Sequence, residues 1–187
     1  MFAINLNPNL LIMKKALLLA VLLCVSVYGF SQGTKYGVRA GYNISNLDFD
    51  GTPILDNEHR NGFAIGFFGE YGFTKTFALM PEIQFSSEGG KTKALRLDYI
   101  QVPVLFKFRL SERIHIGAGP QVGVKVYEHE DGIRNFAYSG VGGLEIKLSH
   151  EFFFDARYTY GFSNIFDDNQ NVEAINTNIQ LGIGYKF

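Results

Sequence analysis

The sequence has little that would support thiol or disulfide chemistry. It contains one cysteine, Cys24, which lies in an N-terminal apolar run that we expect to be removed. The mature chain would therefore have no disulfide framework, no thiolate nucleophile and no cysteine-ligated metal site. The chain also lacks an excess of either charge. Its formal net charge of −1 gives no indication of a nucleic-acid partner, which would require a basic surface.

Long apolar runs are scarce too, and the one that occurs lies near the N-terminus. A basic start, an apolar core and a small-residue end follow one another at Met13–Lys15, Ala16–Tyr28 and Gly29–Ser31. This order predicts that residues 1–31 hold a cleavable signal peptide, with the start at Met13 and the cut after Ser31. A membrane anchor is the alternative, but the core is short of the roughly 20 residues of a spanning helix. Residues 32–187 would then form one domain.

No helical apolar period of useful length follows Gly33. Instead, apolar and small or polar residues alternate in eight stretches, and alternation predicts strands whose two faces differ in polarity. The last stretch is the clearest, because every second residue from Ile179 to Phe187 is apolar. The stretches are Tyr36–Ile44, Phe63–Phe73, Phe77–Phe85, Leu97–Leu110, Ile114–Val126, Tyr138–Leu148, Phe152–Tyr160 and a final one from about Asn176.

The spacers between these stretches alternate in length. Long polar segments at about 47–61, 86–96, 127–135 and 163–174 are interleaved with tight turns at 74–76, 111–113 and 149–150. Outer-membrane barrels combine long extracellular loops with short periplasmic turns and an even strand number. The order therefore predicts an all-β, eight-stranded antiparallel up-and-down transmembrane barrel with both termini in the periplasm.

The alternation also fits a soluble lipocalin-like barrel, which buries its apolar face inside. An eight-stranded interior is only just wide enough for side chains, so it would not hold five or six bulky apolar residues per strand. Charged residues keep to the polar face, as expected if a basic residue facing lipid costs roughly 2–4 kcal/mol at mid-membrane. These two arguments favour the membrane barrel and the outer membrane as its location. The charged residues are Arg39, Glu70, Glu82, Lys107, Lys125, Glu145, Lys147, Asp155 and Arg157.

Aromatic residues are abundant although tryptophan is absent, with 18 Phe and 10 Tyr. They gather at the two ends of the predicted strands, as in the aromatic girdles at membrane interfaces. Ordinary β-propensity explains their abundance but not this placement. The expected periplasmic set is Tyr36, Phe73, Phe77, Phe108, Phe152 and Phe187, and the outer set is Tyr42, Phe63, Phe85, Tyr158 and Tyr160.

Several blocks together resemble the outer-membrane β-barrel domain common in Bacteroidetes, often labelled porin-family or PorT-like. The resemblance implies location and architecture more than a molecular task, although some members resemble a component of a gliding-associated secretion system. It also implies that Ile183, Tyr185 and Phe187 of the last strand form a signal for the barrel-assembly machinery. The blocks are GVRAGYNISNL (37–47), LMPEIQFSSEGG (79–90), LDYIQVPVLFKFRL (97–110), GAGPQVG (117–123), DARYTYGFSNI (155–165) and the terminal GIGYKF.

The nine charged residues, joined by Lys186, form the main candidate site. A low-dielectric interior disfavours unpaired charge, so we expect opposite signs to pair across the barrel. The result is either a structural salt-bridge plug or a narrow polar pathway for ions or small solutes. Broad porin flow is not expected, because aqueous channels are a property of barrels with 16–18 strands.

Catalysis and metal binding are not expected. The histidines are His59, His115, His129 and His150. His59 and His129 lie in predicted outer loops without a phased serine partner, and His115 is expected to face inward near the periplasmic end, although a Ser–His–acid triad is defined by geometry and not by sequence position. The first predicted loop contains Asp48, Asp50, Asp56 and Glu58, and the fourth contains Asp167 and Asp168, without the spacing of a calcium site. We therefore expect no cofactor and no resident metal.

The sequence thus predicts an integral outer-membrane barrel with a structural or interaction role, its lumen closed by charge pairs. A narrow channel or a subunit of a protein-export assembly is the alternative, and a lipid-modifying enzyme a more distant one. Expected partners are outer-membrane lipid, the barrel-assembly machinery and an unidentified envelope or extracellular protein bound by the loops.

Overall fold

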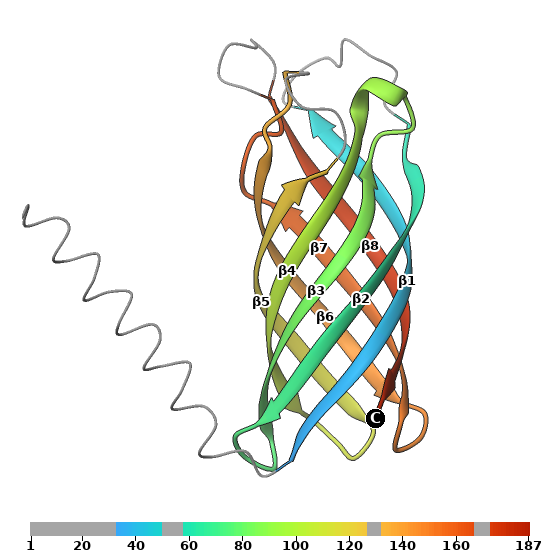
Figure 1. Ribbon diagram of the computed structural model, residues 1–187, viewed down its shortest axis with the longest axis vertical. Coiled ribbons are helices and arrows are strands. Elements are labelled where there is room, and N and C mark those ends of the chain that lie inside the picture. Colours follow the sequence, from blue (N-terminus) through green and yellow to red (C-terminus); the bar gives the residue numbers. More distant parts are fainter. Residues whose placement is uncertain (1–32, 50–57, 127–131, 167–172) are drawn as a thin grey trace, which may run out of the picture.

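A computed structural model of the chain describes residues 33–49, 58–126, 132–166 and 173–187. Within them lie eight strands that form one closed barrel, in which each strand pairs with its neighbours in sequence and β1 pairs with β8 (Figure 1). The predicted eight-stranded antiparallel barrel is therefore confirmed. The predicted signal peptide and start at Met13 lie outside the described residues. The strands are β1 (Thr34–Phe49), β2 (Arg60–Gly72), β3 (Phe77–Gly89), β4 (Arg96–Arg109), β5 (Ile114–Lys125), β6 (Phe136–Lys147), β7 (Phe152–Gly161) and β8 (Ala174–Lys186).

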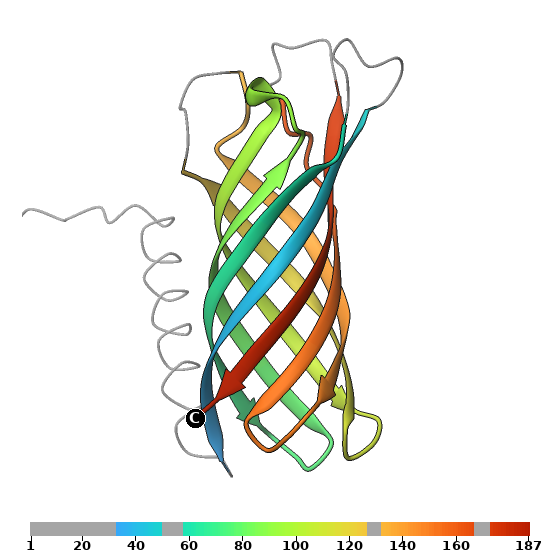
Figure 2. The same ribbon diagram turned by 90° about the vertical axis from the view of Figure 1, so that its right-hand side faces the viewer.

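The barrel has two different ends. The tight connections β2–β3, β4–β5 and β6–β7, the start of β1 and the end of β8 all lie at one end, which we call the turn end (Figures 1 and 2). The ends of β1, β3, β5 and β7 and the starts of β2, β4, β6 and β8 lie at the opposite end, the loop end. In each turn one hydroxyl side chain accepts hydrogen bonds from two backbone amides, as where Ser111 Oγ accepts from the amides of Arg113 and Ile114 at 3.3 and 3.1 Å.

Two strands extend further toward the loop end than the alternation predicts. The first loop was expected to begin at Leu47 and the second at Ser86, but β1 continues to Phe49 and β3 to Gly89. Ser86 pairs with Tyr99 of β4 in the ladder, and Gly89 pairs with Arg96. A short 3₁₀ helix, η2 (Lys93–Leu95), then completes the connection. Gly89 has φ +86°, and a Cβ there would overlap the carbonyl of Leu95, so this position requires glycine.

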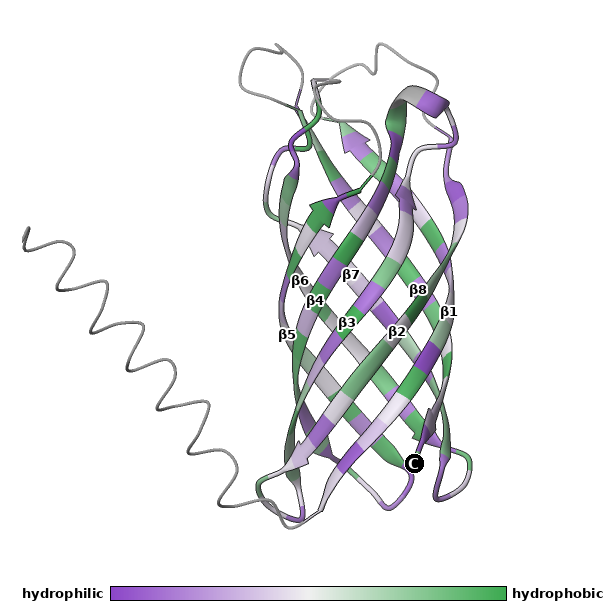
Figure 3. Ribbon diagram, in the orientation of Figure 1, coloured by the Kyte–Doolittle hydropathy of each residue, from purple (hydrophilic) through white to green (hydrophobic). Residues whose placement is uncertain are grey.

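The alternation places apolar side chains outward and polar or small ones inward. On β3 the outward Ile83 is 54% exposed, whereas the inward Gln84 is 4% exposed. Green hydrophobic and purple hydrophilic residues alternate along every strand in Figure 3. Within the described residues no helix has the length and apolar character to cross a membrane.

Glycines on the inner face make room for the large side chains of the lumen. Gly37 lies against the ring of Phe68, and Gly184 lies against the ring of Phe153, so closely that a Cβ at either position would overlap the ring. The two rings meet edge to face with centroids 5.6 Å apart. The inward positions of the barrel are therefore filled by pairing very small residues with very large ones.

Candidate functional site

A ring of four alternating charges lies near the turn end of the lumen. Lys107 Nζ contacts Glu70 Oε2 at 2.7 Å and Glu145 Oε2 at 2.5 Å. Lys186 Nζ contacts the same two carboxylates at 2.9 Å each. The four residues come from β2, β4, β6 and β8, the strands that run toward the turn end, and each lies within two residues of its strand's end. This ring, the charge quartet, is electrically neutral.

An aromatic ring lies beside the quartet. Lys186 Nζ is 4.7 Å from the centroid of Phe153, and Lys107 Nζ is 6.0 Å from it. The negative face of a benzene ring attracts a cation, so Phe153 adds to the stabilisation of both ammonium groups. Phe153 and Phe68 are both inward, which places an apolar layer next to a charged one.

A second charged cluster lies deeper in the barrel, on the strands that run toward the loop end. Arg39 of β1 donates to Asp155 of β7 through Nε at 2.6 Å and Nη2 at 2.5 Å. Arg157 donates to Glu82 of β3 at 2.8 Å and lies 3.5 Å from Asp155. All four side chains are at most 6% exposed. Two cations and two anions again cancel, as burial in low dielectric requires.

A further buried carboxylate, Glu88 of β3, lies toward the loop end and is held by neutral donors. Its Oε1 accepts from Ser86 Oγ at 2.6 Å, Gln101 Nε2 at 2.9 Å and Asn178 Nδ2 at 3.3 Å. Its Oε2 accepts from Asn176 Nδ2 at 2.6 Å. No ion pair joins Glu88 to a described cation. Both oxygens are nevertheless satisfied by hydrogen bonds, which is what allows a buried carboxylate.

A chain of hydrogen bonds with one direction connects Arg39 to Glu88. Arg39 Nη1 donates to Gln180 Oε1, and Gln180 Nε2 donates to Asn43 Oδ1 at 2.7 Å. Asn43 Nδ2 then donates to Ser86 Oγ at 2.9 Å, and Ser86 donates to Glu88. Each bond in such a chain polarises the next. The chain therefore links the deeper cluster to the carboxylate at the loop end.

An apolar cluster lies beyond Glu88 and closes the loop end. It gathers strand ends and connections that are distant in sequence, and its buried members are 0–4% exposed. The bridge between Ile133 and Phe166 ties two of these connections together. The buried members are Leu47, Leu95, Leu97, Tyr99, Ile133, Ile165 and Ala174.

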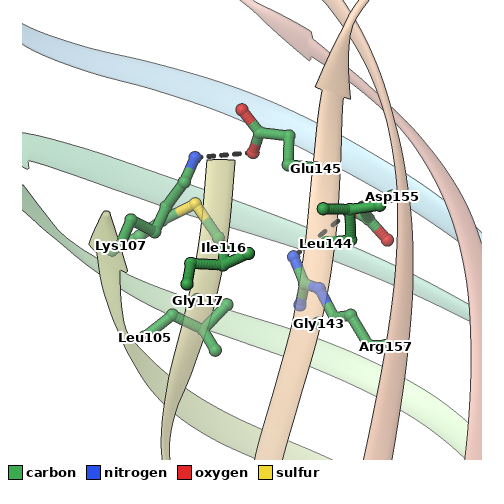
Figure 4. A pocket seen from close by; sticks show the side chains of 10 residues that line it. Leu105, Lys107, Ile116, Gly117, Gly143, Leu144, Glu145, Asp155 and Arg157 are labelled. Carbon is green, nitrogen blue, oxygen red and sulfur yellow. Dashed lines mark hydrogen bonds and ion pairs between the residues drawn. The ribbon is translucent and has the colours of Figure 1, made fainter. Parts of the chain in front are cut away.

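Little empty space remains between these layers. The cavity beside Lys107, Glu145, Asp155 and Arg157 has a volume of about 20 Å³ (Figure 4). The cavity beside Glu88 and Tyr99 has the same volume. One water molecule needs about 10–15 Å³ on this measure. Neither cavity therefore holds more than about one water.

Seven of the nine predicted charged residues lie in the two clusters, and two lie elsewhere. Lys125 is buried near the loop end, where its Nζ donates to the carbonyl of Ile133 at 3.3 Å. Lys147 is half-buried at the turn end and forms no ion pair with a described residue. The sequence reasoning did not single out Glu88 or its amide donors. The available signal was the inward phase of β3, which continues from Glu82 and Gln84 through Ser86 to Glu88.

The three residues of the predicted assembly signal lie on the outer face at the turn end. Ile183 is 51% exposed and Phe187 is 64% exposed. Tyr185 packs against Phe152 with ring centroids 4.9 Å apart. Their role in assembly stays a prediction.

The described residues contain no group of three or more histidine, cysteine, aspartate or glutamate side chains that could hold a metal ion. His59 and His150 are exposed at opposite ends, whereas His115 is 7% exposed and its Nδ1 is buried without a hydrogen-bond partner. His129 and the loop acids Asp50, Asp56, Asp167 and Asp168 lie outside the described residues.

The comparisons with known proteins agree with this architecture. Ail, the attachment invasion locus protein of Yersinia pestis, is 19% identical, with 83% of this chain and 100% of that chain covered and a TM-score of 0.54. Neisserial surface protein A (NspA) is 13% identical, with the same coverage and a TM-score of 0.57. At such identities the likeness shows the fold alone. No curated protein matches the chain. The family described as "Outer membrane protein beta-barrel domain" matches residues 30–167, so the chain belongs to this family of outer-membrane β-barrels.

Proposed function

We propose that this protein is a closed outer-membrane barrel with a structural or interaction role, not a conduit. The filled interior carries the proposal. From the turn end inward there follow the charge quartet, the Phe68–Phe153 pair, the deeper charged cluster, the hydrogen-bonded Glu88 and the apolar cluster at the loop end. A barrel whose interior is fully packed presents its loops on a rigid frame, and loops on rigid frames commonly carry binding functions.

The orientation that we propose has the loop end outside the cell and both termini in the periplasm. The short turns and long loops support this orientation, because outer-membrane barrels place them in that way. The proposed signal peptide in residues 1–31 would deliver the chain to the periplasm. There the exposed Phe187 and Ile183 would be available to the assembly machinery before the barrel closes.

The finer assignment to PorT-like barrels of Bacteroidetes rests on the sequence blocks alone and remains part of this proposal. The alternative roles in the same proposal are a narrow channel and a subunit of an export assembly. The small size of the two interior cavities argues against the channel, whereas an export subunit that acts through its surface is compatible with a filled barrel. The absence of a described catalytic constellation gives no support to a lipid-modifying enzyme.

Planar-bilayer recording tests the closed barrel directly. The purified protein should give no steady single-channel openings. Glu82→Ala should introduce at most irregular openings by unbalancing the deeper cluster, and the exposed Glu112→Ala should behave as the unaltered protein. Steady openings of the unaltered protein that change with Glu82→Ala or Arg157→Ala would instead assign a permeation role to the same charges.

Cysteine labelling on intact cells tests the orientation. Because the predicted mature chain has no cysteine, Lys93→Cys at the loop end and Lys75→Cys at the turn end each introduce a single thiol. A membrane-impermeant maleimide should label only the Lys93→Cys protein. Crosslinking from the same Lys93→Cys position, followed by purification, would then identify a loop-bound partner, with Lys75→Cys as the matched control.

A further inference from the structure

The turn end carries a hollow whose lining is mostly basic. It has a volume of about 610 Å³ and spans the mouth from the start of β1 to the β4–β5 and β6–β7 turns. Its cationic side chains are Lys35, Arg109, Arg113 and Lys147, and its one carboxylate is Glu112. These residues come from opposite sides of the barrel, so the hollow lies over the mouth and not beside a single strand.

A smaller hollow of about 110 Å³ adjoins the first. The two share Arg109 and Lys147 in their lining, and the smaller one adds Lys75 and His115. Its floor includes Glu70 and Lys107 of the charge quartet. We call the two hollows together the basic vestibule.

Five cations of the vestibule differ from those of the lumen in forming no ion pair with a described carboxylate. Lys107 and Lys186 each contact two carboxylates, and both arginines of the deeper cluster are paired. Within the described part of the chain, Lys35, Lys75, Arg109, Arg113 and Lys147 form no ion pair. Like charges that line a concave surface raise the local positive potential, and a bound anion would relieve it.

A second observation also points to a ligand. His115, which lines the smaller hollow, is 7% exposed, and its Nδ1 has no hydrogen-bond partner within the described residues. Buried polar atoms are rarely left unpaired. A protonated Nδ1 would donate to an oxyanion held by the neighbouring Arg109 and Lys147.

We propose that the basic vestibule binds phosphate groups. A guanidinium offers phosphate two parallel donors, while lysine ammonium groups add point charges from several sides. Soluble polyphosphates and phospholipid head groups share this chemistry, and both are within reach of a barrel mouth at the membrane surface. The inference does not depend on the proposed interaction role of the loops.

Two probes separate the sources of phosphate. The first is sodium tripolyphosphate, titrated into the full-length protein in zwitterionic detergent and followed by calorimetry. The second is phosphatidylglycerol added to the same micelles, with retained lipid counted by native mass spectrometry and phosphatidylcholine as reference. The test variant is Arg109→Gln with Lys147→Gln. The control is Lys93→Gln with Arg96→Gln, which removes the same charges from the exposed loop end.

Removal of two unpaired cations should weaken tripolyphosphate binding about tenfold or more, whereas the control should bind as the unaltered protein. A second outcome is that the unaltered protein retains phosphatidylglycerol but does not bind tripolyphosphate. If the test variant alone then lost the lipid, the vestibule would be assigned to lipid head groups. If neither probe binds, or both double variants lose binding equally, the vestibule is not a phosphate site. Heat-modifiable gel mobility verifies that each variant is folded.

Discussion

Arg39 of β1 reaches over β8 to form a two-point ion pair with Asp155 of β7, and Gly182 of β8 lies beneath the guanidinium. The ladder places Gly182 opposite Asp155 on one side and Gly41 on the other. A strand therefore separates the two charged residues, and they meet only because that strand has no side chain at this position. The ion pair depends on a glycine that carries no charge itself.

Gly182→Ala should accordingly destabilise the barrel. A Cβ at this position would overlap the Arg39 guanidinium, and displacing a packed side chain costs typically about 1–3 kcal/mol. The measurement is urea unfolding in lipid vesicles, followed by tyrosine fluorescence.

Gly142→Ala is the matched control, because its Cβ would meet no described atom closer than 3.9 Å. It should be neutral or slightly stabilising, since alanine has less backbone freedom to lose on folding. Equal losses for the two alanines would show that glycine at position 182 matters through the backbone and not through Arg39.

Asp155→Asn should lower the free energy of unfolding more than Gly182→Ala does. It leaves Arg39 and Arg157 with Glu82 as their only carboxylate partner in the cluster. Breaking a buried ion pair by removing one partner costs about 3–5 kcal/mol. The same unfolding measurement applies.

The double variant Arg39→Met with Asp155→Asn restores the charge balance in the deeper cluster. It should lose clearly less stability than the sum of the two single changes, as expected for residues in direct contact. Additive losses would mean that the two side chains are independent, which would contradict the pairing.

The salt bridge between Lys91 and Glu58 lies in the loop region, outside the strands, and both side chains are well exposed. The Lys91 ammonium donates a hydrogen bond to the Glu58 carboxylate and holds the pKa of Glu58 below its ordinary value. The contact is therefore present above the ordinary carboxylate pKa and is lost as the pH falls through the lowered one. Lys91→Gln should raise the Glu58 pKa toward the ordinary value in a ¹³C carboxyl titration.

Lys93→Gln is the control for that titration, because Lys93 is exposed and forms no ion pair with a described residue. It should leave the Glu58 pKa unchanged. The same rise in both variants would indicate a general effect of loop charge and not the Lys91 contact.

The strands and their faces were predictable from the sequence because a strand has a period of two, and every stretch keeps its phase. Ile65 outward and Glu82 inward follow from that period alone. The ends of the strands were not predictable, because Ser86 to Gly89 has the composition of a turn and becomes a strand only through pairing with β4.

Which buried charges pair with one another could not be predicted from the sequence either. That Lys107 contacts both Glu70 and Glu145, but not Asp155, depends on how far each strand is staggered around the barrel. The apolar cluster at the loop end could not be predicted for a related reason. Leu47, Leu95 and Ile165 lie in or beside predicted loops, and only the closed barrel brings them together.

Glu88→Gln tests whether the carboxylate at the loop end is required as an acceptor. Its two oxygens receive hydrogen bonds from Ser86, Gln101, Asn176 and Asn178, and an amide would place its own N–H groups against one of those donors. Leaving buried donors unsatisfied costs about 1–3 kcal/mol, so the variant should lose stability in this range. Glu112→Gln at the exposed turn end should change it by no more than about 0.5 kcal/mol. If Glu88→Gln left the stability unchanged, the surrounding amides would have rotated to accept the new donor. The chain of hydrogen bonds from Arg39 to Glu88 would then have no energetic role.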